Sequence, residues 1–485
     1  MKNKSILKSC MVAALGFLAA ACSDDINLGQ VNPDNAVVPD GDIIYITDAA
    51  GKRHFSNVEF RGNSTEKLTL NTPHELANDC SVSFAYDESV LTEYNEKNMS
   101  SYVALPADMV SFAGNGVATL SAGSTSTSVE YTITSDGSLD PSATYVLPVR
   151  VSVTDGNASL GSVDATRIIF VRDLTALPDA TKYVRDADGN LVPGIKVFSC
   201  MEVNDTNPLN NLSFTLKNAE IADNNGKPLV DALIIFSANI NYNPETGRVY
   251  IFNNENVQAL LDNREHYLKP LQDRGMKIIL GILGNHDRSG IANLDDDTSV
   301  EFAKECKAVC DAYNLDGIFV DDEYSSYQTP PPPGFVSPSK AAASRLMYEI
   351  KKAMPDRLMV AYCYSRTYGA DNVKDLETGE TVKAGDFVDY ALHDYGGSAD
   401  LASSFDGMQR WQMGLYSQEF NQGRMASLSN LKRMRENGYG AHMIFAMDPN
   451  RNNFYSQQSA MQNCAEAFYD ADLEFDGIKY PKDWK

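Results

Sequence analysis

The segment LDGIFVDDEYSSY, residues 315–327, begins with apolar and β-branched residues and then continues into three consecutive acids. The apolar run is typical of a buried strand, and a buried carboxylate that lacks a partner costs several kcal/mol. Asp321, Asp322 and Glu323 therefore indicate a special role for the end of this strand. They bind a cation there, or they carry out acid/base chemistry.

The alternation of side chains along a strand separates these three acids. Asp321 and Glu323, two residues apart, share a face, whereas Asp322 points to the other side. Phe319 shares the face of the first pair and lies deeper. A partly desolvated carboxyl group beside a like charge has a raised pKa, which suits proton donation near neutral pH. This pattern favours acid/base chemistry over a site for Mg²⁺ or Ca²⁺.

Strand-like and helix-like segments alternate on both sides of this strand. Eight apolar strand candidates run from GIKVFSCMEV to AHMIFAMD, and helical patterns such as TSVEFAKECKAVCDAYN lie in several of the gaps. Eight buried strands with helices between them are the count of a (β/α)8 barrel, whose active site lies at the C-terminal ends of the strands. We therefore predict an α/β fold with a (β/α)8 TIM barrel over residues 193–485.

A different pattern precedes the predicted barrel. Short alternating runs such as SVSFAYD and SVEYTITSD, separated by turn residues, occupy residues 43–175 and predict an all-β sandwich domain. This region contains no cluster of His, Cys or carboxylate residues that would support chemistry, which favours a structural or spacer role over glycan binding. We expect residues 176–192 to be the linker to the barrel.

The N-terminus has the pattern of an export signal. Three lysines within the first eight residues precede an apolar stretch, and small residues then run into Cys22. This ending resembles the cleavage site of bacterial lipoproteins, so we expect residues 1–21 to be a signal peptide and residues 22–42 a lipidated tether. Two or more acyl chains on Cys22 suffice for stable anchoring. Ser23-Asp24-Asp25 resembles the acidic tag of surface lipoproteins, which predicts an exported outer membrane lipoprotein at the cell surface.

The charge of the chain excludes one class of partner. The formal net charge is −24, and removal of residues 1–21 deletes three lysines and no acids, which moves it to −27. A polyanion of this size is a poor binder of nucleic acid or of anionic lipid. We expect no nucleic-acid partner.

Three linked motifs resemble one enzyme family. LDGIFVDDEY resembles the DGxDxDxE motif of glycoside hydrolase family 18, except that Phe319 replaces the first inner acid. IILGILGNHDRSGIANL is similar to the third-strand segment of the Endo H and Endo F type endo-β-N-acetylglucosaminidases of that family. VDYALHDYGG and GYGAHMIFAMD occupy the places of the sixth and eighth strands. The resemblance implies cleavage of the β-1,4 bond between the two core GlcNAc residues of N-glycans.

The resemblance also implies roles for individual residues. Family 18 is an exception to the scheme with two catalytic carboxylates, because the substrate's own N-acetyl group is the nucleophile of a retaining reaction. Glu323 would protonate the departing oxygen and later deprotonate water, Asp321 would stabilise the oxazolinium, and Tyr395 would hydrogen-bond the acetamide carbonyl. No cofactor or metal is implied. Candidate sugar-binding residues are Asn285, Asn239, His286, Phe236 and Met447, although the last two are residue types found more often in a core.

Three other functions are open at this point. A non-catalytic surface lipoprotein that binds N-glycans is disfavoured because Glu323 is present. A chitinase-like family 18 hydrolase is disfavoured by LGNHD, where chitinases usually carry SxGG. Residues 284–287, GNHD, resemble one motif of dinuclear metallophosphoesterases, but the six histidines of the chain form no HxH pair.

Overall fold

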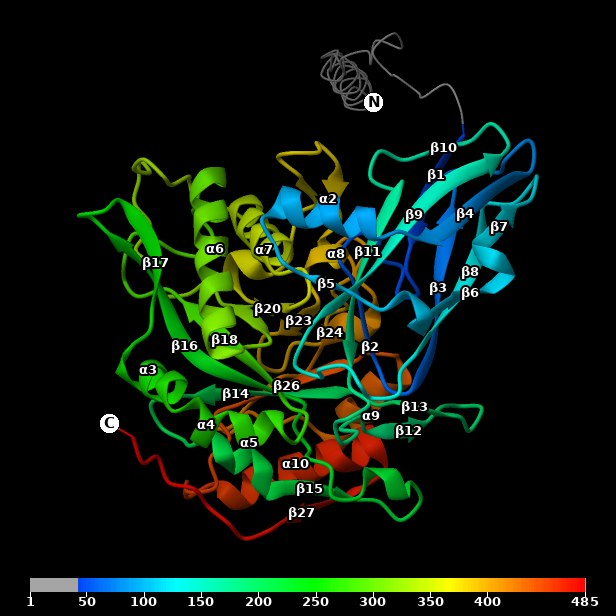
Figure 1. Cartoon of the computed structure of the whole chain (residues 1–485). Coiled ribbons are helices and arrows are strands. Elements are labelled where there is room, and N and C mark those ends of the chain that lie inside the picture. The colour runs from blue at the N-terminus through cyan, green and yellow to red at the C-terminus, as the bar shows by residue number, and fades with distance from the viewer. Residues whose placement is uncertain (1–41, 485) are drawn as a thin grey trace, which may run out of the picture.

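Residues 42–484 are described by a computed structural model, which places a β-rich N-terminal unit beside a larger α/β unit (Figure 1). The predicted signal peptide and the predicted lipidation site at Cys22 lie outside the described residues. None of the helices within residues 42–484 combines the length and the apolar character needed to cross a membrane.

Two sheets packed face to face form the N-terminal unit. One has the order β10-β1-β3-β8-β6, with β10 at Ser159–Leu160, β1 at Ile43–Thr47, β3 at Asn63–Asn71, β8 at Ser126–Thr134 and β6 at Val110–Phe112. The other has the order β2-β11-β9-β4-β7, with β2 at Ser56–Phe60, β11 at Thr166–Asp173, β9 at Tyr145–Asp155, β4 at Cys80–Tyr86 and β7 at Val117–Leu120. β5 (Val103–Ala104) pairs with β9, and α2 (Glu88–Asn98) contacts β9 and β11. The predicted β-sandwich is confirmed.

Eight parallel strands form the second unit. They are β14 (Lys196–Glu202), β16 (Ala232–Asn243), β18 (Lys277–Leu283), β19 (Gly317–Val320), β20 (Leu358–Cys363), β23 (Tyr390–His393), β24 (Met413–Gly414) and β26 (Ala441–Phe445). β14 pairs in parallel with both β16 and β26, which closes the sheet into a ring. The predicted (β/α)8 barrel is confirmed.

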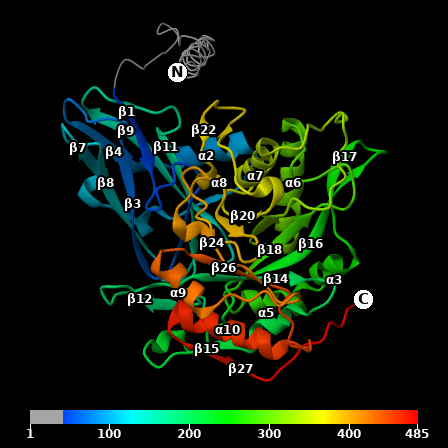
Figure 2. The same cartoon turned by 180° about the vertical axis from the view of Figure 1, so that it is seen from behind.

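Helices surround the ring on its outer side (Figure 2). They are α3 (Glu255–Asp262), α4 (Arg264–Tyr267), α5 (Lys269–Gln272), α6 (Asp296–Tyr313), α7 (Lys340–Ala353), α8 (Ala384–Phe387), α9 (Leu428–Glu436) and α10 (Phe454–Tyr469). α6 begins where it does because the side chain of Asp295 accepts a hydrogen bond from the backbone N–H of Thr298 at 2.9 Å. Asp296 and Asp297 in its first turn are favourable for the helix dipole.

Short strands complete the structure. β17 (Arg248–Phe252) pairs antiparallel with β16, and β25 (Gln418–Glu419) pairs with β26. The remaining strands form three separate pairs: β12 (Tyr183–Arg185) with β13 (Leu191–Pro193), β15 (Phe214–Lys217) with β27 (Asp472–Phe475), and β21 (Val373–Lys374) with β22 (Thr381–Val382). Most of the predicted linker, residues 176–192, therefore lies in the hairpin of β12 and β13.

Apolar side chains fill the lumen of the barrel. They include Phe198, Ile234, Ile279, Phe319, Val360, Leu392 and Met443, each from a different strand. Phe319 packs edge-on against the ring of Phe236, with the ring centroids 6.1 Å apart. The lumen is therefore a packed core, and a substrate can enter only at its ends.

A buried ionic cluster joins the two units. Nζ of Lys52, in the N-terminal unit, lies 2.9 Å from Oδ1 of Asp389, which directly precedes β23. Nζ of Lys351 lies 2.8 Å from Oδ2 of the same carboxylate, which also accepts a hydrogen bond from the backbone N–H of Met359. Burial alone would raise the pKa of Asp389, but the ammonium groups of Lys351 and Lys52 lower it. The N-terminal unit thus supplies part of the base of the barrel.

The substitution Asp389→Asn tests the importance of this cluster. It leaves two buried ammonium groups facing a neutral side chain, and the loss of one partner from a buried ion pair typically costs about 3–5 kcal/mol. We expect a destabilisation of that size in urea unfolding monitored by fluorescence. The control is Lys97→Gln, which breaks an exposed ion pair between the two units, Lys97 with Glu377 at 3.3 Å. Exposed pairs contribute about 0–1 kcal/mol, so an equal loss in both variants would contradict the assignment.

Candidate active site

Asp321 follows the last residue of β19, at the C-terminal end of the barrel strand. Its side chain is directed to the lumen side, above Phe319, and the residue is only 3% exposed. Its backbone N–H donates to the carbonyl of Ile282 at 3.1 Å, which continues the pairing with β18. Oδ1 is buried and has no hydrogen-bond partner among the described residues. An unpartnered buried carboxyl oxygen is costly in a resting protein and is a ready acceptor for a ligand.

Several carboxylates surround Asp321 and change its acidity. Burial raises the pKa of Asp321 well above its ordinary value, and the negative charges of Glu323, Asp322 and Asp394 raise it further. The pKa of Glu323, which is about half-buried, is raised by desolvation and then by the charges of Asp394 and Asp322. Both acids therefore favour their protonated forms to a higher pH than exposed carboxyls do.

Asp322 points away from this pair. Its Oδ1 accepts a hydrogen bond from the hydroxyl of Tyr327, and its Oδ2 lies 3.3 Å from both the backbone nitrogen and Nη1 of Arg366. Asp322 is therefore a paired, buried acid that fixes the loop after β19. The strand alternation divides the three acids as the sequence pattern predicts.

Asp394 is a site residue that the sequence analysis missed. It follows β23, and its Oδ1 accepts hydrogen bonds from the hydroxyl of Tyr362 at 2.5 Å and from the backbone N–H of Tyr395 at 2.6 Å. Its charge raises the pKa of both Asp321 and Glu323. An acid directly after a barrel strand was the available signal, since HDYGG ends the sixth strand.

Tyr395 lies among aromatic rings at the mouth of the lumen. Its ring centroid is 5.9 Å from those of Tyr362 and Phe445. Desolvation raises the pKa of Tyr395, and the charge of Asp321 contributes to the rise. The phenol is therefore held as an O–H donor on the same side of the barrel as Asp321.

The loops after β18 and β19 are joined by backbone hydrogen bonds. The N–H of Gly284 donates to the carbonyl of Glu323 at 3.1 Å, and that of His286 donates to the carbonyl of Tyr324 at 2.6 Å. A Cβ atom on Gly284 would lie 2.2 Å from the carbonyl oxygen of Glu323, so a side chain there would displace the acid. His286 and Tyr324 both have positive φ, 55° and 57°. Such strained residues cluster at functional sites.

The predicted sugar-binding residues differ in how far the structure exposes them. Asn285 and His286 are exposed at the rim, near Glu323. Asn239 braces the end of β18, because its Nδ2 lies 3.2 Å from the carbonyl oxygen of Gly284. Phe236 is half-buried and packs against Phe319 and Phe445 at the lumen, whereas Met447 is a core residue, buried in the cluster outside the lumen.

Asp287, the acid of the GNHD segment, has a structural role. Its Oδ2 accepts a hydrogen bond from the backbone N–H of Tyr242 at 3.1 Å, and its Oδ1 accepts one from that of Ser289 at 3.0 Å. Within residues 42–484, no group of three or more His, Cys, Asp or Glu side chains is arranged to hold a metal ion.

The raised pKa of Asp321 predicts how the stability of the folded chain changes with pH. Above about pH 4, where a carboxyl in the unfolded chain has lost its proton, the folded chain still holds the proton on Asp321, so its stability falls as the pH rises. We expect Asp321→Asn to melt at a higher temperature than the parent at pH 7 and at a similar temperature near pH 3.5. Asp322→Asn, which weakens the contacts with Tyr327 and Arg366, should show no such gain. A gain in the control, or none in Asp321→Asn, would contradict the assignment.

Known proteins share sequence and fold with this chain. A family model for an N-terminal domain matches residues 38–158. Endo-beta-N-acetylglucosaminidase F1 of Elizabethkingia meningoseptica is 56% identical over 297 residues, which cover 61% of this chain and 84% of the relative. An endo-beta-N-acetylglucosaminidase of a Flavobacterium species (strain SK1022) is 33% identical over 223 residues, 46% of this chain and 67% of the relative.

Solved structures extend the similarity over both units. The crystal structure of Bacteroides thetaiotamicron EndoBT-3987 with Man5GlcNAc product has a TM-score of 0.80 and 34% identity, and the match covers 91% of this chain and 98% of that chain. The same enzyme in complex with Man9GlcNAc2Asn substrate gives a TM-score of 0.72 and 32% identity. On the identity with these relatives and the share of each that is matched, the chain belongs to the endo-β-N-acetylglucosaminidase family.

Proposed function

We propose that this endo-β-N-acetylglucosaminidase cleaves the β-1,4 bond between the two core GlcNAc residues of N-glycans. The proposal rests on one observation above the others. A buried carboxyl oxygen of Asp321, which has no hydrogen-bond partner within residues 42–484, lies beside Glu323, an acid whose pKa is raised, at the open end of the barrel. Its relatives support the substrate class, since EndoBT-3987 has been crystallised with an N-glycan substrate and with a glycan product.

We infer that the reaction follows the substrate-assisted route of glycoside hydrolase family 18. Glu323 donates its proton to the glycosidic oxygen while the carbonyl oxygen of the substrate's acetamide attacks the anomeric carbon, which breaks the glycosidic bond and forms an oxazolinium ion. Glu323, now a carboxylate, then takes a proton from water as the water attacks the same carbon. The ring reopens, and the sugar keeps its original configuration.

Asp321 and Tyr395 position the acetamide in this scheme. The free Oδ1 of Asp321 accepts the acetamide N–H, and the hydroxyl of Tyr395 donates to the acetamide carbonyl. The surrounding carboxylates disfavour ionised Asp321 in the empty site. A positively charged oxazolinium offsets that repulsion, so Asp321 interacts more strongly with the transition state than with the substrate.

Asp394 supplies the negative charge near Asp321 that an inner acid at the position of Phe319 would otherwise supply. Because Phe319 is fully buried and apolar, no carboxyl lies beneath Asp321 on β19. Asp394 instead acts from the end of β23, and its hydrogen bonds to Tyr362 and Tyr395 fix its orientation. We propose Asn285 and His286 at the rim as sugar contacts.

Glu323→Gln tests the assignment of the general acid. Loss of a general acid typically costs 10²- to 10⁴-fold in rate, so the turnover of an N-glycoprotein should fall by that factor while glycan binding is kept.

Asp321→Asn should also slow hydrolysis. This variant should still transfer glycan from a preformed sugar oxazoline to a GlcNAc acceptor, because the oxazoline has already been formed. Mass spectrometry of products and measurement of binding by calorimetry check both.

The products discriminate this reaction from others. One GlcNAc should remain on the asparagine, and EDTA should not lower the rate. A bare aspartate after digestion would identify amidase cleavage, and a covalent glycosyl-enzyme trapped in Asp321→Asn would assign the nucleophile to the protein. Either result contradicts the mechanism.

We propose that the enzyme is exported and anchored in the outer membrane through lipidated Cys22, and acts at the cell surface. The basic start, the apolar stretch and the small residues that run into Cys22 support this placement. Surface display would bring the catalytic barrel to glycoproteins outside the cell.

Cys22→Ala should release the enzyme from the membrane fraction, whereas Cys10→Ala, in the predicted signal peptide, should leave it anchored. Protease added to intact cells should remove the anchored form. Full protection in intact cells, with digestion only after lysis, would place the enzyme in the periplasm.

A further inference from the structure

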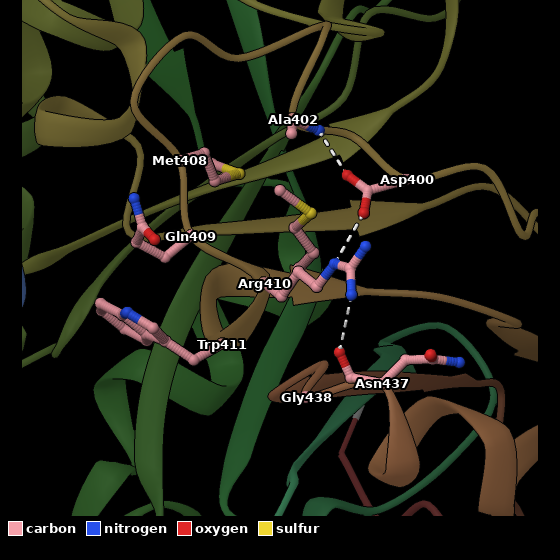
Figure 3. Close-up of a pocket in the computed structure, with 9 residues that line it drawn as sticks. Asp400, Ala402, Met408, Gln409, Arg410, Trp411, Asn437 and Gly438 are labelled. Carbon is pink, nitrogen blue, oxygen red and sulfur yellow. Dashed lines mark hydrogen bonds and ion pairs between the residues drawn. The ribbon is translucent and has the colours of Figure 1, made fainter.

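A hollow lies at the end of the barrel opposite to the acids. It has a volume of about 500 Å³ and is bordered by residues that precede β24 and β26, including Gln409, Arg410, Trp411 and Asn437 (Figure 3). These positions are at the N-terminal ends of the strands, whereas Asp321 and Glu323 follow the C-terminal end of β19. The hollow is wide and open to the solvent, so a ligand there would be contacted on one side and not enclosed.

Trp411 forms an exposed aromatic wall beside this hollow. It is one of two tryptophans in the chain and is 40% exposed. Its ring meets that of Tyr390 at 85° with centroids 6.2 Å apart, and Nζ of Lys52 lies 5.9 Å from its centroid. The indole is thus fixed from the protein side and open to the solvent. An indole exposed in this way offers a large apolar face to a ligand.

The turn that carries Trp411 is held rigidly. Trp411 lies in a 3₁₀ turn, Arg410–Gln412, and the buried side chain of Gln412 donates to the carbonyls of Gly385 and Val388 at 3.0 Å each. Oε1 of Gln412 also accepts a hydrogen bond from the backbone N–H of Gln409 at 2.9 Å. The wall is therefore pre-organised, which lowers the entropy cost of binding a ligand.

The charges that border the hollow cancel. Nε of Arg410 lies 2.8 Å from Oδ2 of Asp400, and this carboxylate also accepts hydrogen bonds from the hydroxyl of Tyr439 at 2.8 Å and the backbone N–H of Ala402 at 2.9 Å. Figure 3 shows Arg410 bridging Asp400 and the backbone carbonyl of Asn437. A site with one satisfied ion pair favours neither an anion nor a cation.

The remaining polar groups are planar hydrogen-bonding groups. Arg410 and the side-chain amides of Gln409 and Asn437 are exposed at the border, and buried Met408 also lines the hollow. Nε2 of Gln409 donates to the carbonyl of Gly407 at 3.2 Å and Nδ2 of Asn437 to that of Arg433 at 2.9 Å, which fixes the orientation of both amides. A pyranose ring matches this combination, because it offers an apolar face of C–H groups to an indole and a rim of neutral hydroxyls to planar donors and acceptors.

We propose that this hollow is a second carbohydrate-binding site, which takes a neutral sugar residue stacked on Trp411 and hydrogen-bonded to Arg410 and Gln409. It lies across the barrel from the cleavage site, so it binds a sugar other than the one being cleaved. The proposal is independent of the proposed mechanism.

Tryptophan fluorescence tests this directly. In the full-length chain with Glu323→Gln and Trp484→Phe, Trp411 is the sole tryptophan and the catalytic acid is absent. Titration with mannose, GlcNAc and the glycan product Man5GlcNAc should give a saturable change with Kd in the millimolar range, a weak affinity of about −4 kcal/mol. The matched control, Glu323→Gln with Trp411→Phe, keeps only Trp484 and should show no saturable change.

Two border variants complete the test. Gln409→Ala and Arg410→Gln in the reporter background should weaken sugar binding at least tenfold, while in the otherwise unchanged enzyme they should leave hydrolysis of small glycopeptides intact. That second readout shows that the variants fold and separates this site from the cleavage site. The proposal is overturned if Trp411 gives no saturable response to any of the three sugars, or if both variants bind as well as their background.

Discussion

The pairing of β14 with β26 closes the barrel, and the position of every residue at the site depends on that closure. In a closed ring each strand has one inner and one outer face, so alternate residues of β19 divide between lumen and helices. Phe319 and Asp321 thus belong to the lumen, and Asp322 belongs to the outer layer with Tyr327 and Arg366. Only β20 lies between β19 and β23 in the sheet, so Asp394, at the end of β23, is close enough to influence the acids that follow β19.

Closure also brings several carboxylates together, and their burial and mutual repulsion raise the pKa of the acids proposed to carry out the chemistry. Asp321, Glu323 and Asp394 lie at one mouth above an apolar lumen, so their charges repel one another with little water to screen them. Hydrogen bonds from Tyr362 and Tyr395 stabilise Asp394, whereas no group in the described part of the chain donates to Oδ1 of Asp321. The unfavourable energy is therefore concentrated on Asp321, the acid to which we assign the contact with the acetamide.

The sequence could predict the parts of this structure that local patterns determine. Apolar strands with helices between them led to the barrel, and strand alternation separated Asp322 from Asp321 and Glu323. Asp394 was not identified because its importance depends on a neighbour on another strand, and no periodicity reports such a distance. Asn239 was expected to contact sugar because it lies at the end of the second strand, and Met447 was a candidate platform for a sugar ring. The structure turns Asn239 onto the backbone of Gly284 and buries Met447, which are outcomes of packing.

The ionic cluster at the base of the barrel has a consequence for how the chain is made. Lys52 lies 337 residues before Asp389, so during synthesis the sandwich leaves the ribosome long before its partner exists. Its ammonium group is solvated until β23 is in place, and only then is it withdrawn from water. Domains generally fold as units in the order of their synthesis. The sandwich, with the ammonium group of Lys52 on its surface, is thus already folded when the later strands of the barrel assemble against it.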